Sequence, residues 1–305
     1  MKNFKVGLIF QQNTAEAKIA QATKNGIVNA MKNLGLNFVE IPFTQNFVDD
    51  IKTHKIDLIF NAMHGKYGED GYIQTILNAL QIPYTHSGVE ASQIGMNKVL
   101  TNLYAKSCNI PVNESIVIHK NDILSSNYSI SKKSVIKPVT GGSSVATFIL
   151  EKDEFLVESQ LEEVANFKDG NFFMIEEFFA GNEIAVGILN DKVIGTCKII
   201  PAEEFYSYNA KYNSKATIYE TPAEISETIR EKLHNDALKL YNAIGACAIS
   251  RVDFICTKTD YRLLEINTNP GMTATSLIPK IGACVGISYE QIVENLIQNA
   301  KFEVI

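Results

Sequence analysis

The sequence predicts an α/β fold, with α+β character in its later part, built from two or three packed subdomains. Three observations support this prediction. The chain has 305 residues, more than one hydrophobic core usually serves. In its first part, short apolar runs typical of β-strands alternate with a segment whose apolar residues recur at helical spacing, as in an open α/β layer. Its later part places strand-like runs next to each other in pairs, which is typical of antiparallel hairpins.

Composition and charge restrict the class of protein. An apolar fraction of 46% with 20% charged residues is that of a soluble globular protein. The net charge of −6 provides no basic field for nucleic acid or anionic lipid. The scattered cysteines argue against a disulfide framework and a zinc site. No apolar run resembles a signal peptide or a membrane span. We therefore expect a cytoplasmic protein with small-molecule partners, binding neither nucleic acid nor membrane.

The first elements belong to the predicted α/β layer. FKVGLIF (4–10) is a short apolar run of the type buried on both faces of a sheet. A helix is expected next, ending near Gly35. LNFVEIPF (36–43) and IDLIFNAMHG (56–65) are then the second and third strands, and the Gly-rich KYGEDGY follows. Ligands of such a layer bind just beyond the carboxyl ends of its strands.

The middle of the chain changes from helix to paired strands. SQIGMNKVLTNLYAKSCNIP (92–111) has a helical period, with Ser92 as its expected cap. Two strand-like runs within residues 117–150 flank the turn Gly141-Gly142-Ser143-Ser144. Residues 172–189 are predicted to form a strand, a hinge and a second strand.

The last third begins with a long loop and ends in helices. Residues 201–222 contain many tyrosines and no steady period, so we expect a long surface loop, of a length that is usually functional or disordered. An amphipathic helix is expected over residues 226–245, and a hairpin over residues 249–267. Ser276 and Ser288 are expected to cap the remaining two helices.

The hairpin contains the strongest candidate for a metal site. Residues two apart in a strand point the same way, so Arg251 shares a face with Asp253, and Glu265 shares one with Asn267. If the strands pair, the two faces coincide. Carboxylate and amide oxygens suit a hard cation such as Mg²⁺. The alternative is a solvated outer face with surface ion pairs, and the apolar residues between these positions count against it.

Two further segments have features of nucleotide sites. Lys137 lies in an otherwise apolar strand, and a buried ammonium needs an anion. The glycines that follow would let backbone N–H groups approach a phosphate, although the Walker A spacing is absent; an ordinary turn is the alternative. Glu176 and Glu183 flank an aromatic hinge that could hold a nucleoside, or could simply be a hairpin with exposed carboxylates.

The start of the helix at Ser276 is a candidate carboxylate site. Free N–H groups at a helix N-terminus, together with a hydroxyl, attract an anion. Simple capping of the helix by Ser276 explains the same residue equally well.

The order of these segments resembles the ATP-grasp ligases and, within them, the D-alanine–D-alanine ligases. The resemblance runs nearly end to end, and N-P-G-M-T-x-T-S-L after E-x-N is its most specific part. It implies an ATP-grasp fold: a substrate-binding α/β domain over 1–97, a central lid subdomain over 98–183, and a catalytic domain with an antiparallel sheet over 184–305, including a lid loop at 203–217. The motifs are NAMHGKYGEDGYIQ (61–74), IPYTHSGVEAS (82–92), MNKVLT (96–101), FYSYNAKY (205–212), RVDF (251–254) and EINTNPGMTATSLIP (265–279).

The resemblance also implies a function and its residues. It implies ATP-dependent joining of two D-alanines, through an acyl phosphate, for peptidoglycan precursors and cell-wall synthesis, by a homodimer. ATP would be bound by Lys98, Lys137, Ser143, Ser144, Glu176, Phe178, Phe179, Glu183 and Lys211, and two Mg²⁺ ions, which Mn²⁺ could replace, by Asp253, Glu265 and Asn267. The substrates would be bound by Glu16, His64, Tyr212, Arg251, Gly271, Ser276 and Leu277. Catalysis would involve Glu16, Ser143, Tyr212, Arg251 and Gly271.

Two alternatives and several departures from the family pattern accompany this prediction. One alternative is an ATP-grasp ligase with another acceptor, such as D-lactate; the other is a non-catalytic nucleotide-binding regulator. Gln11-Gln12 stands where the family has two glycines, and Ala20 where a serine is usual. Asn97 replaces an aspartate, and Gly141 replaces an acid in the phosphate loop. These departures concern the first-substrate pocket and the loop, and none removes a predicted metal ligand.

Overall fold

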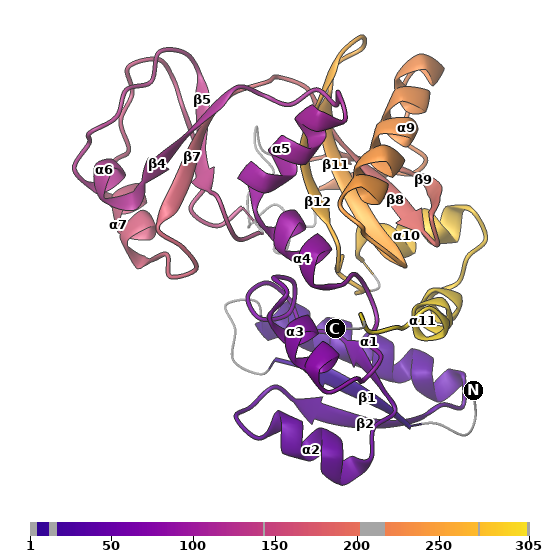
Figure 1. The fold of residues 1–305 in the computed structure, drawn as a ribbon. Coiled ribbons are helices and arrows are strands. Elements are labelled where there is room, and N and C mark those ends of the chain that lie inside the picture. The colour runs from indigo at the N-terminus through magenta and orange to yellow at the C-terminus, as the bar shows by residue number, and fades with distance from the viewer. Residues whose placement is uncertain (1–4, 12–16, 143, 202–216, 274, 304–305) are drawn as a thin grey trace.

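The chain folds into three sheet-based units. The central unit has its own hydrophobic core, whereas one core is shared between the N-terminal unit and the C-terminal unit. The computed structural model describes residues 5–11, 17–142, 144–201, 217–273 and 275–303. Figure 1 shows the N-terminal unit at the bottom, the central unit at the upper left and the C-terminal unit at the upper right. The sheets contain three, four and five strands, respectively, among the described residues.

The N-terminal unit is a parallel sheet covered on both faces. Its strands are β1 (Lys5–Phe10), β2 (Asn37–Pro42) and β3 (Leu58–Asn61), in the order β2-β1-β3. Successive side chains of a strand point to opposite faces. Leu8 therefore packs toward α1 (Ala17–Asn33) and α11 (Tyr289–Gln298), whereas Ile9 packs toward α2 (Phe47–His54) and α3 (Tyr72–Ala79). This double burial explains why β1 and β3 are nearly continuous apolar runs, whereas the edge strand β2 has exposed polar residues at Asn37 and Glu40.

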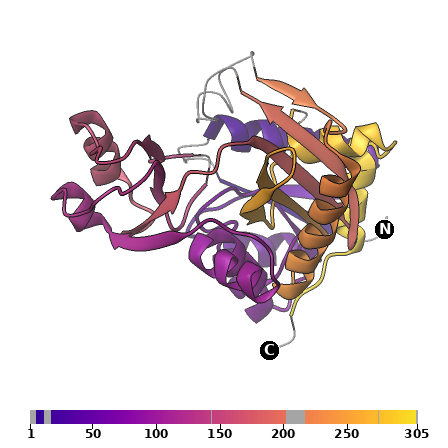
Figure 2. The ribbon, with the colours of Figure 1, turned by 90° about the horizontal axis from the view of Figure 1, so that it is seen from above.

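Two short helices lead into the central unit, which forms a separate lobe in Figure 2. They are α4 (Val89–Met96) and α5 (Lys98–Ser107). The antiparallel sheet of the lobe has the order β4-β7-β5-β6, and two helices pack on one face around Ile136 and Phe173. The elements are β4 (Ser115–His119), α6 (Lys120–Leu124), β5 (Ser134–Pro138), β6 (Phe148–Leu150), α7 (Glu158–Asn166) and β7 (Phe172–Glu177).

The C-terminal unit is an antiparallel sheet between helices. Its order is β10-β9-β8-β11-β12. Val186 and Leu233 belong to the core between the sheet and α9, and Ala185 and Ile281 to the core on the α10 side. The elements are β8 (Asn182–Leu189), β9 (Lys192–Ile200), β10 (Ile218–Glu220), α9 (Glu227–Ala243), β11 (Ile249–Cys256), β12 (Tyr261–Asn267) and α10 (Leu277–Cys284).

The predicted fold class is confirmed, and three predicted elements need correction. The single helix expected over 92–111 is two helices, because Asn97 leaves the helical conformation and its side chain accepts the N–H groups of Val99 and Leu100 as the N-cap of α5. Ser92 therefore lies inside α4 and is not a cap. Within the expected loop 201–222, residues 218–220 form β10 and pair with β9.

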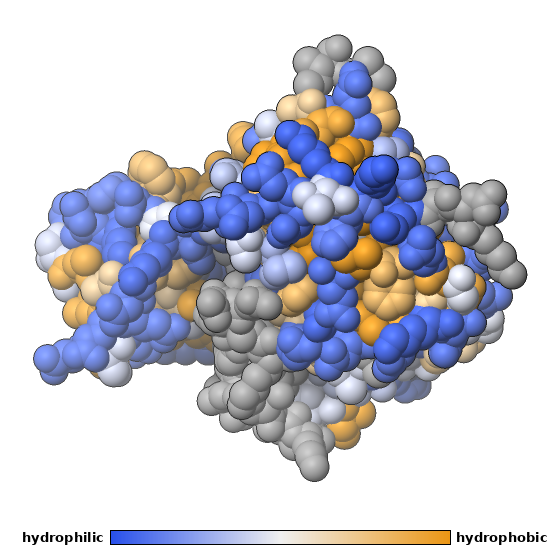
Figure 3. Space-filling view, turned by 90° about the horizontal axis from the view of Figure 1, so that it is seen from below, coloured by the Kyte–Doolittle hydropathy of each residue, from blue (hydrophilic) through white to orange (hydrophobic). Residues whose placement is uncertain are grey.

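The surface agrees with the composition. In Figure 3 hydrophilic residues cover most of the visible face, and hydrophobic residues lie between them in smaller areas. Among the described residues, no helix has the length and apolar character needed to cross a bilayer.

Candidate active site

The hairpin β11–β12 brings Arg251, Asp253, Glu265 and Asn267 together. Arg251 pairs with Asn267 and Asp253 with Glu265 across the two strands, so all four side chains are on one face. Arg251 Nε donates to both Asp253 carboxylate oxygens, at 2.9 and 3.0 Å, and Nη2 donates to Oδ2 at 2.7 Å. Asn267 Nδ2 donates to Asp253 Oδ2 at 3.2 Å and to Glu265 Oε1 at 3.4 Å. This connected cluster differs from a solvated face with isolated ion pairs.

The charges of this cluster depend on one another. Asp253 is only 2% exposed, and the buried carboxylate is balanced by the guanidinium that contacts it. Burial by itself would lower the pKa of Arg251, but Asp253, with smaller contributions from Glu265 and Glu183, raises it above its usual value. Arg251 therefore stays positively charged at any physiological pH. Together, the guanidinium and the two hairpin carboxylates leave one net negative charge at this face.

The donor set of the hairpin fits a divalent hard cation. Asp253 and Glu265 supply carboxylate oxygens next to each other, and a half-turn of the Asn267 amide would present its oxygen. Among the described residues, no group of three or more His, Cys, Asp or Glu side chains is placed to hold a metal. A cation here would therefore need further oxygen ligands from a bound molecule, which is how Mg²⁺ usually binds with nucleotide phosphates.

A cavity of about 390 Å³ opens between the central sheet and the C-terminal sheet. One wall comes from β5 and β7 of the central lobe, and the other from β9, β11 and β12. The predicted residues that line it are Lys98, Lys137, Ser144, Glu176, Phe178, Phe179, Glu183, Asp253 and Glu265. The structure thus brings these predicted nucleotide and metal residues around one space, whereas the third predicted metal ligand, Asn267, adjoins it through Asp253 and Glu265.

Two lysines reach this cavity from different elements. Lys137 Nζ lies 2.6 Å from Glu176 Oε2, and both side chains are buried, so each charge stabilises the other. Lys137 lies in β5 and Glu176 in β7, which is the adjacent strand. Lys98, the first residue of α5, donates from Nζ to the Gly141 carbonyl at 2.7 Å. Lys137 is therefore beside the expected nucleoside residue, and Lys98 is beside the expected phosphate loop.

The hinge between β7 and β8 forms the aromatic end of the cavity. Phe178 has the ammonium of Lys133 at 4.9 Å from its ring centroid, and Phe179 has the guanidinium carbon of Arg262 at 4.7 Å. Such cation–π contacts fix the ring positions. Gly181 is required in the hinge because an added Cβ would lie 2.6 Å from the Cys256 carbonyl.

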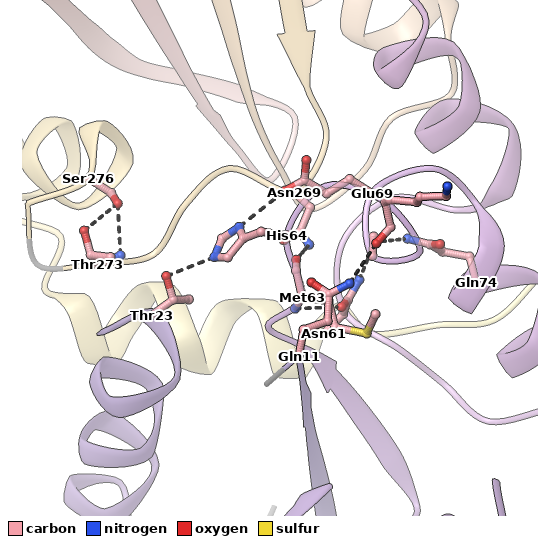
Figure 4. A network of polar contacts seen from close by, with 12 residues as sticks. Gln11, Thr23, Asn61, Met63, His64, Glu69, Gln74, Asn269, Thr273 and Ser276 are labelled. Atoms are coloured by element: carbon pink, nitrogen blue, oxygen red, sulfur yellow. Dashed lines mark hydrogen bonds and ion pairs between the residues drawn. The ribbon is translucent and has the colours of Figure 1, made fainter. Parts of the chain in front are cut away.

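The predicted substrate residue His64 follows β3 and is preceded by Met63, whose carbonyl contacts Asn269 of the N-P-G-M turn. Figure 4 shows its ring between Thr23 of α1 and the loop of Glu69. Its Nε2 is 3.0 Å from Thr23 Oγ1, and its Nδ1 is 3.4 Å from Glu69 Oε1. These contacts orient the ring at the carboxyl edge of the parallel sheet, where a ligand of an α/β layer is expected.

The predicted carboxylate site at Ser276 has a different local structure from the expected cap. Ser276 is the N-cap residue of α10, but its side chain makes no capping hydrogen bond. Its Oγ instead accepts the Thr273 N–H at 3.0 Å and lies 2.8 Å from Thr273 Oγ1. The Leu277 side chain is buried in the core with Ile281. Any ligand contact of Leu277 would therefore come from its backbone at the helix start.

Some predicted residues lie outside the described part of the chain, and several departures have a structural explanation. Glu16, Ser143, Lys211 and Tyr212 are outside the described residues, as is the loop 203–216. Gly141 adopts φ +111°, which favours glycine over the acid of the family pattern. Asn97 keeps the capping role that an aspartate would have.

Two polar residues near the site make contacts that were not predicted from the sequence. Gln11 is 8% exposed, and its Nε2 donates to the Lys66 carbonyl at 2.8 Å. Asn269 is 5% exposed, and its Nδ2 donates to the Met63 carbonyl at 3.0 Å. The position of Asn269 directly before Pro-Gly was a signal of a turn residue, but its partner is 206 residues away in the chain.

Comparisons with known proteins agree with this geometry. A family model described as "D-ala D-ala ligase C-terminus" matches residues 105–298, and one described as "D-ala D-ala ligase N-terminus" matches residues 10–87. A D-alanine--D-alanine ligase of Chelativorans sp. is 35% identical over 310 residues, covering 99% of each chain. The crystal structure of the Bacillus anthracis D-alanine--D-alanine ligase has a TM-score of 0.80 at 30% identity, covering 97% of this chain and 96% of that one. The same enzyme complexed with ATP has a TM-score of 0.79 at 26% identity, with the same coverage.

Proposed function

The chain belongs to the D-alanine–D-alanine ligase family, and we propose that it joins two D-alanine molecules, with ATP converted to ADP and phosphate. The product, D-alanyl-D-alanine, would serve peptidoglycan precursor and cell-wall synthesis. One observation supports the proposal most directly. The charged cluster of Arg251, Asp253, Glu265 and Asn267 adjoins the cavity that Lys98 and Lys137 line from its other wall.

The first step is phosphoryl transfer. The carboxylate oxygen of the first D-alanine attacks the γ-phosphorus of ATP, the bond to the β-phosphate oxygen breaks, and ADP leaves. Catalysis of such a step is mostly positioning and charge neutralisation. Lys98, Lys137 and the loop through Ser143 and Ser144 hold the phosphates, whereas Glu176 and the Phe178–Phe179 hinge hold the nucleoside. Glu183 and Lys211 complete the nucleotide site.

The second step forms the peptide bond. The amine of the second D-alanine attacks the acyl phosphate carbonyl, the amine loses a proton, and inorganic phosphate leaves. The Arg251 guanidinium and the Gly271 N–H stabilise the negative charge that develops on the carbonyl oxygen. Glu16 binds the ammonium of the first substrate near His64. Ser276 and the Leu277 backbone receive the carboxylate of the second.

Asp253, Glu265 and Asn267 would hold two Mg²⁺ ions, which Mn²⁺ could replace, and these ions neutralise phosphate charge when bound. Tyr212, in the loop 203–217, would close over the site with Glu16 and Ser143 and exclude water, because an acyl phosphate exposed to water is hydrolysed.

The organisation of the protein is part of the same proposal. We assign substrate binding to residues 1–97, the lid subdomain to 98–183 and the catalytic domain to 184–305. We further propose a cytoplasmic homodimer, on family resemblance.

A coupled assay tests the function. Purified protein is incubated with Mg-ATP and D-alanine, and ADP, phosphate and dipeptide are measured together. We expect one ADP, one phosphate and one dipeptide per turnover. Replacing the acceptor by D-lactate tests the alternative acceptor, and equal or greater turnover with D-lactate would change the assigned substrate. Absence of both ADP and dipeptide would instead support a non-catalytic nucleotide-binding protein.

A further inference from the structure

The loop after β3, residues 62–71, is held by four carboxamide side chains. Their Nδ2 or Nε2 atoms donate to backbone carbonyl groups of the loop: Gln11 to Lys66 at 2.8 Å, Asn61 to Gly68 at 2.8 Å, Gln74 to Gly68 at 2.9 Å and Asn269 to Met63 at 3.0 Å. Three of these side chains belong to the N-terminal unit, whereas Asn269 belongs to the C-terminal unit. Asn269 is therefore the member of this set that ties the loop to the segment directly after β12.

The carbonyl that Asn269 contacts belongs to the peptide directly before His64. The N–H of the same residue, Met63, donates to Asn61 Oδ1 at 3.1 Å. The backbone of Met63 is thus fixed from the N-terminal unit through its N–H and from the C-terminal unit through its C=O. His64 continues from this fixed point toward Thr23 (Figure 4).

On its other side, Asn269 begins the turn that contains Gly271. The far end of this turn is also fixed, because Tyr289 of α11 donates its hydroxyl to the Met272 carbonyl at 2.5 Å. Thr273 then bonds to Ser276 through its N–H at 3.0 Å. Gly271 therefore lies between two anchored positions, one of which is tied to the loop of His64.

We propose that Asn269 is a positioning residue, which sets the Gly271 N–H at a fixed distance from the loop that orients the first substrate. The inference rests on the proposed function. In this role Asn269 does not contact the reacting atoms. It aligns the Gly271 N–H of the C-terminal unit with the first D-alanine, which is held by the N-terminal unit. A misplacement of about 1 Å in such an arrangement can cost about 100-fold in rate.

Misalignment has a specific chemical consequence. Attack of the amine on the acyl phosphate requires the Gly271 N–H to be aligned with the carbonyl oxygen. Formation of the acyl phosphate from ATP takes place instead at the γ-phosphorus. If capture slows, water can take the place of the amine, which returns D-alanine and phosphate without dipeptide. Loss of Asn269 is therefore expected to uncouple ATP consumption from peptide formation.

The test compares Asn269→Asp, Asn269→Ala and Tyr241→Phe with the wild type. Asn269→Asp keeps the shape but places an acceptor against the Met63 carbonyl, and Asn269→Ala removes the side chain without adding charge. Tyr241→Phe is the control, since it removes the hydrogen bond of another buried side chain, from Tyr241 to Asp191 at 2.8 Å, which does not line the cavity. We measure kcat, the affinity for ADP, and the ratio of phosphate released to dipeptide formed.

In both Asn269 variants we expect kcat for dipeptide to fall roughly 10- to 100-fold. The phosphate-to-dipeptide ratio should rise from one to about two or more, because hydrolysis competes with capture. ADP affinity should change by less than about twofold, because neither Asn269 nor Met63 lines the cavity of the nucleotide residues. The Tyr241→Phe protein should keep a ratio of one.

A ratio that stays at one in both Asn269 variants, whatever their rate, overturns the inference, because a purely structural role slows both products equally. If the wild type itself forms no dipeptide, the proposed function fails instead.

Discussion

The two regions that border the proposed active site are held in different ways. On the hairpin β11–β12, charged side chains contact one another directly, with Arg251 between Asp253 and Glu265. On the loop 62–71, neutral carboxamides such as Asn61 and Asn269 hold backbone carbonyl groups. The hairpin therefore concentrates charge where phosphates would bind, whereas the carboxamides around the loop fix its backbone without adding charge. Substitutions on the hairpin should chiefly change chemistry, and those on the loop should change alignment.

The largest effect is expected from Glu265→Gln. A neutral amide cannot supply the anionic oxygen that two divalent cations would share, so turnover should fall by at least about 1,000-fold. The fold should be retained, because Glu265 is partly exposed and its neighbours remain paired. ADP release and the thermal melting curve measure the two properties together.

Glu227→Gln, an exposed position on α9, is the control for this change. It should keep near-normal activity. Near-normal activity in Glu265→Gln as well would mean that the metal assignment is wrong.

A smaller and more selective effect is expected from Lys137→Met. Loss of a charge-assisted contact costs about 1.5–3 kcal/mol, which corresponds to about 10- to 150-fold in affinity. We expect weaker ATP binding of that order, with a nearly unchanged KM for D-alanine, because Lys137 lies at the nucleotide end of the cavity. Nucleotide titration measures the affinity for ATP, and steady-state kinetics measure the KM for D-alanine.

Lys132→Met tests whether this effect is local. Lys132 also pairs with a carboxylate of β7, Glu177 at 2.5 Å, but it is largely exposed. Its loss should change ATP affinity by less than about twofold, since exposed pairs contribute little. An equal effect of both variants would argue against a specific role for the buried pair.

The smallest effect is expected on stability, at a buried histidine that contacts the strand leading into the loop 62–71. His86 is 3% exposed and contacts Thr85 Oγ1 through Nδ1 at 2.8 Å, and the same Oγ1 accepts the Asn61 N–H. Burial lowers the pKa of His86 from 6.5 to about 3. Between these two values the unfolded chain binds a proton that the folded protein does not, so stability falls as pH falls through this window.

When the pH falls from 6.5 to 5, protonation of His86 in the unfolded chain should by itself lower the free energy of unfolding by ~2 kcal/mol. His86→Asn removes the titrating group, and asparagine tolerates the φ of +74° found at this position. Denaturant unfolding at several pH values should show a shallower loss in the variant. Equal pH dependence in both proteins would contradict the assignment.

The arrangement of the hairpin could be predicted from the sequence because it depends on residues close together in the chain. Alternation along a strand places Arg251 and Asp253 on one face, and a short turn brings the second strand to the same face. The loop could not be predicted in this way. The partners of Gln11 and Asn269 lie 55 and 206 residues away, and no local period reports a contact of that kind.

The errors have a different origin, because the contacts that were missed are local. Helical periodicity continued through Asn97, so the break between α4 and α5 was missed, although Asn is a common N-cap. Ser276 was expected to cap α10 through its side chain, but its hydroxyl contacts Thr273, three residues earlier, instead. The residue roles that depend on Glu16, Ser143, Lys211 and Tyr212 stay predictions.

The cavity shared by two sheets has a thermodynamic consequence for the whole molecule. Its walls belong to separate hydrophobic cores, around Ile136 in the central lobe and around Val186 in the C-terminal unit. A molecule bound there contacts both, so it is released when either core melts. Saturation would make the two cores melt cooperatively as one unit, with a gain that grows as the logarithm of ligand concentration.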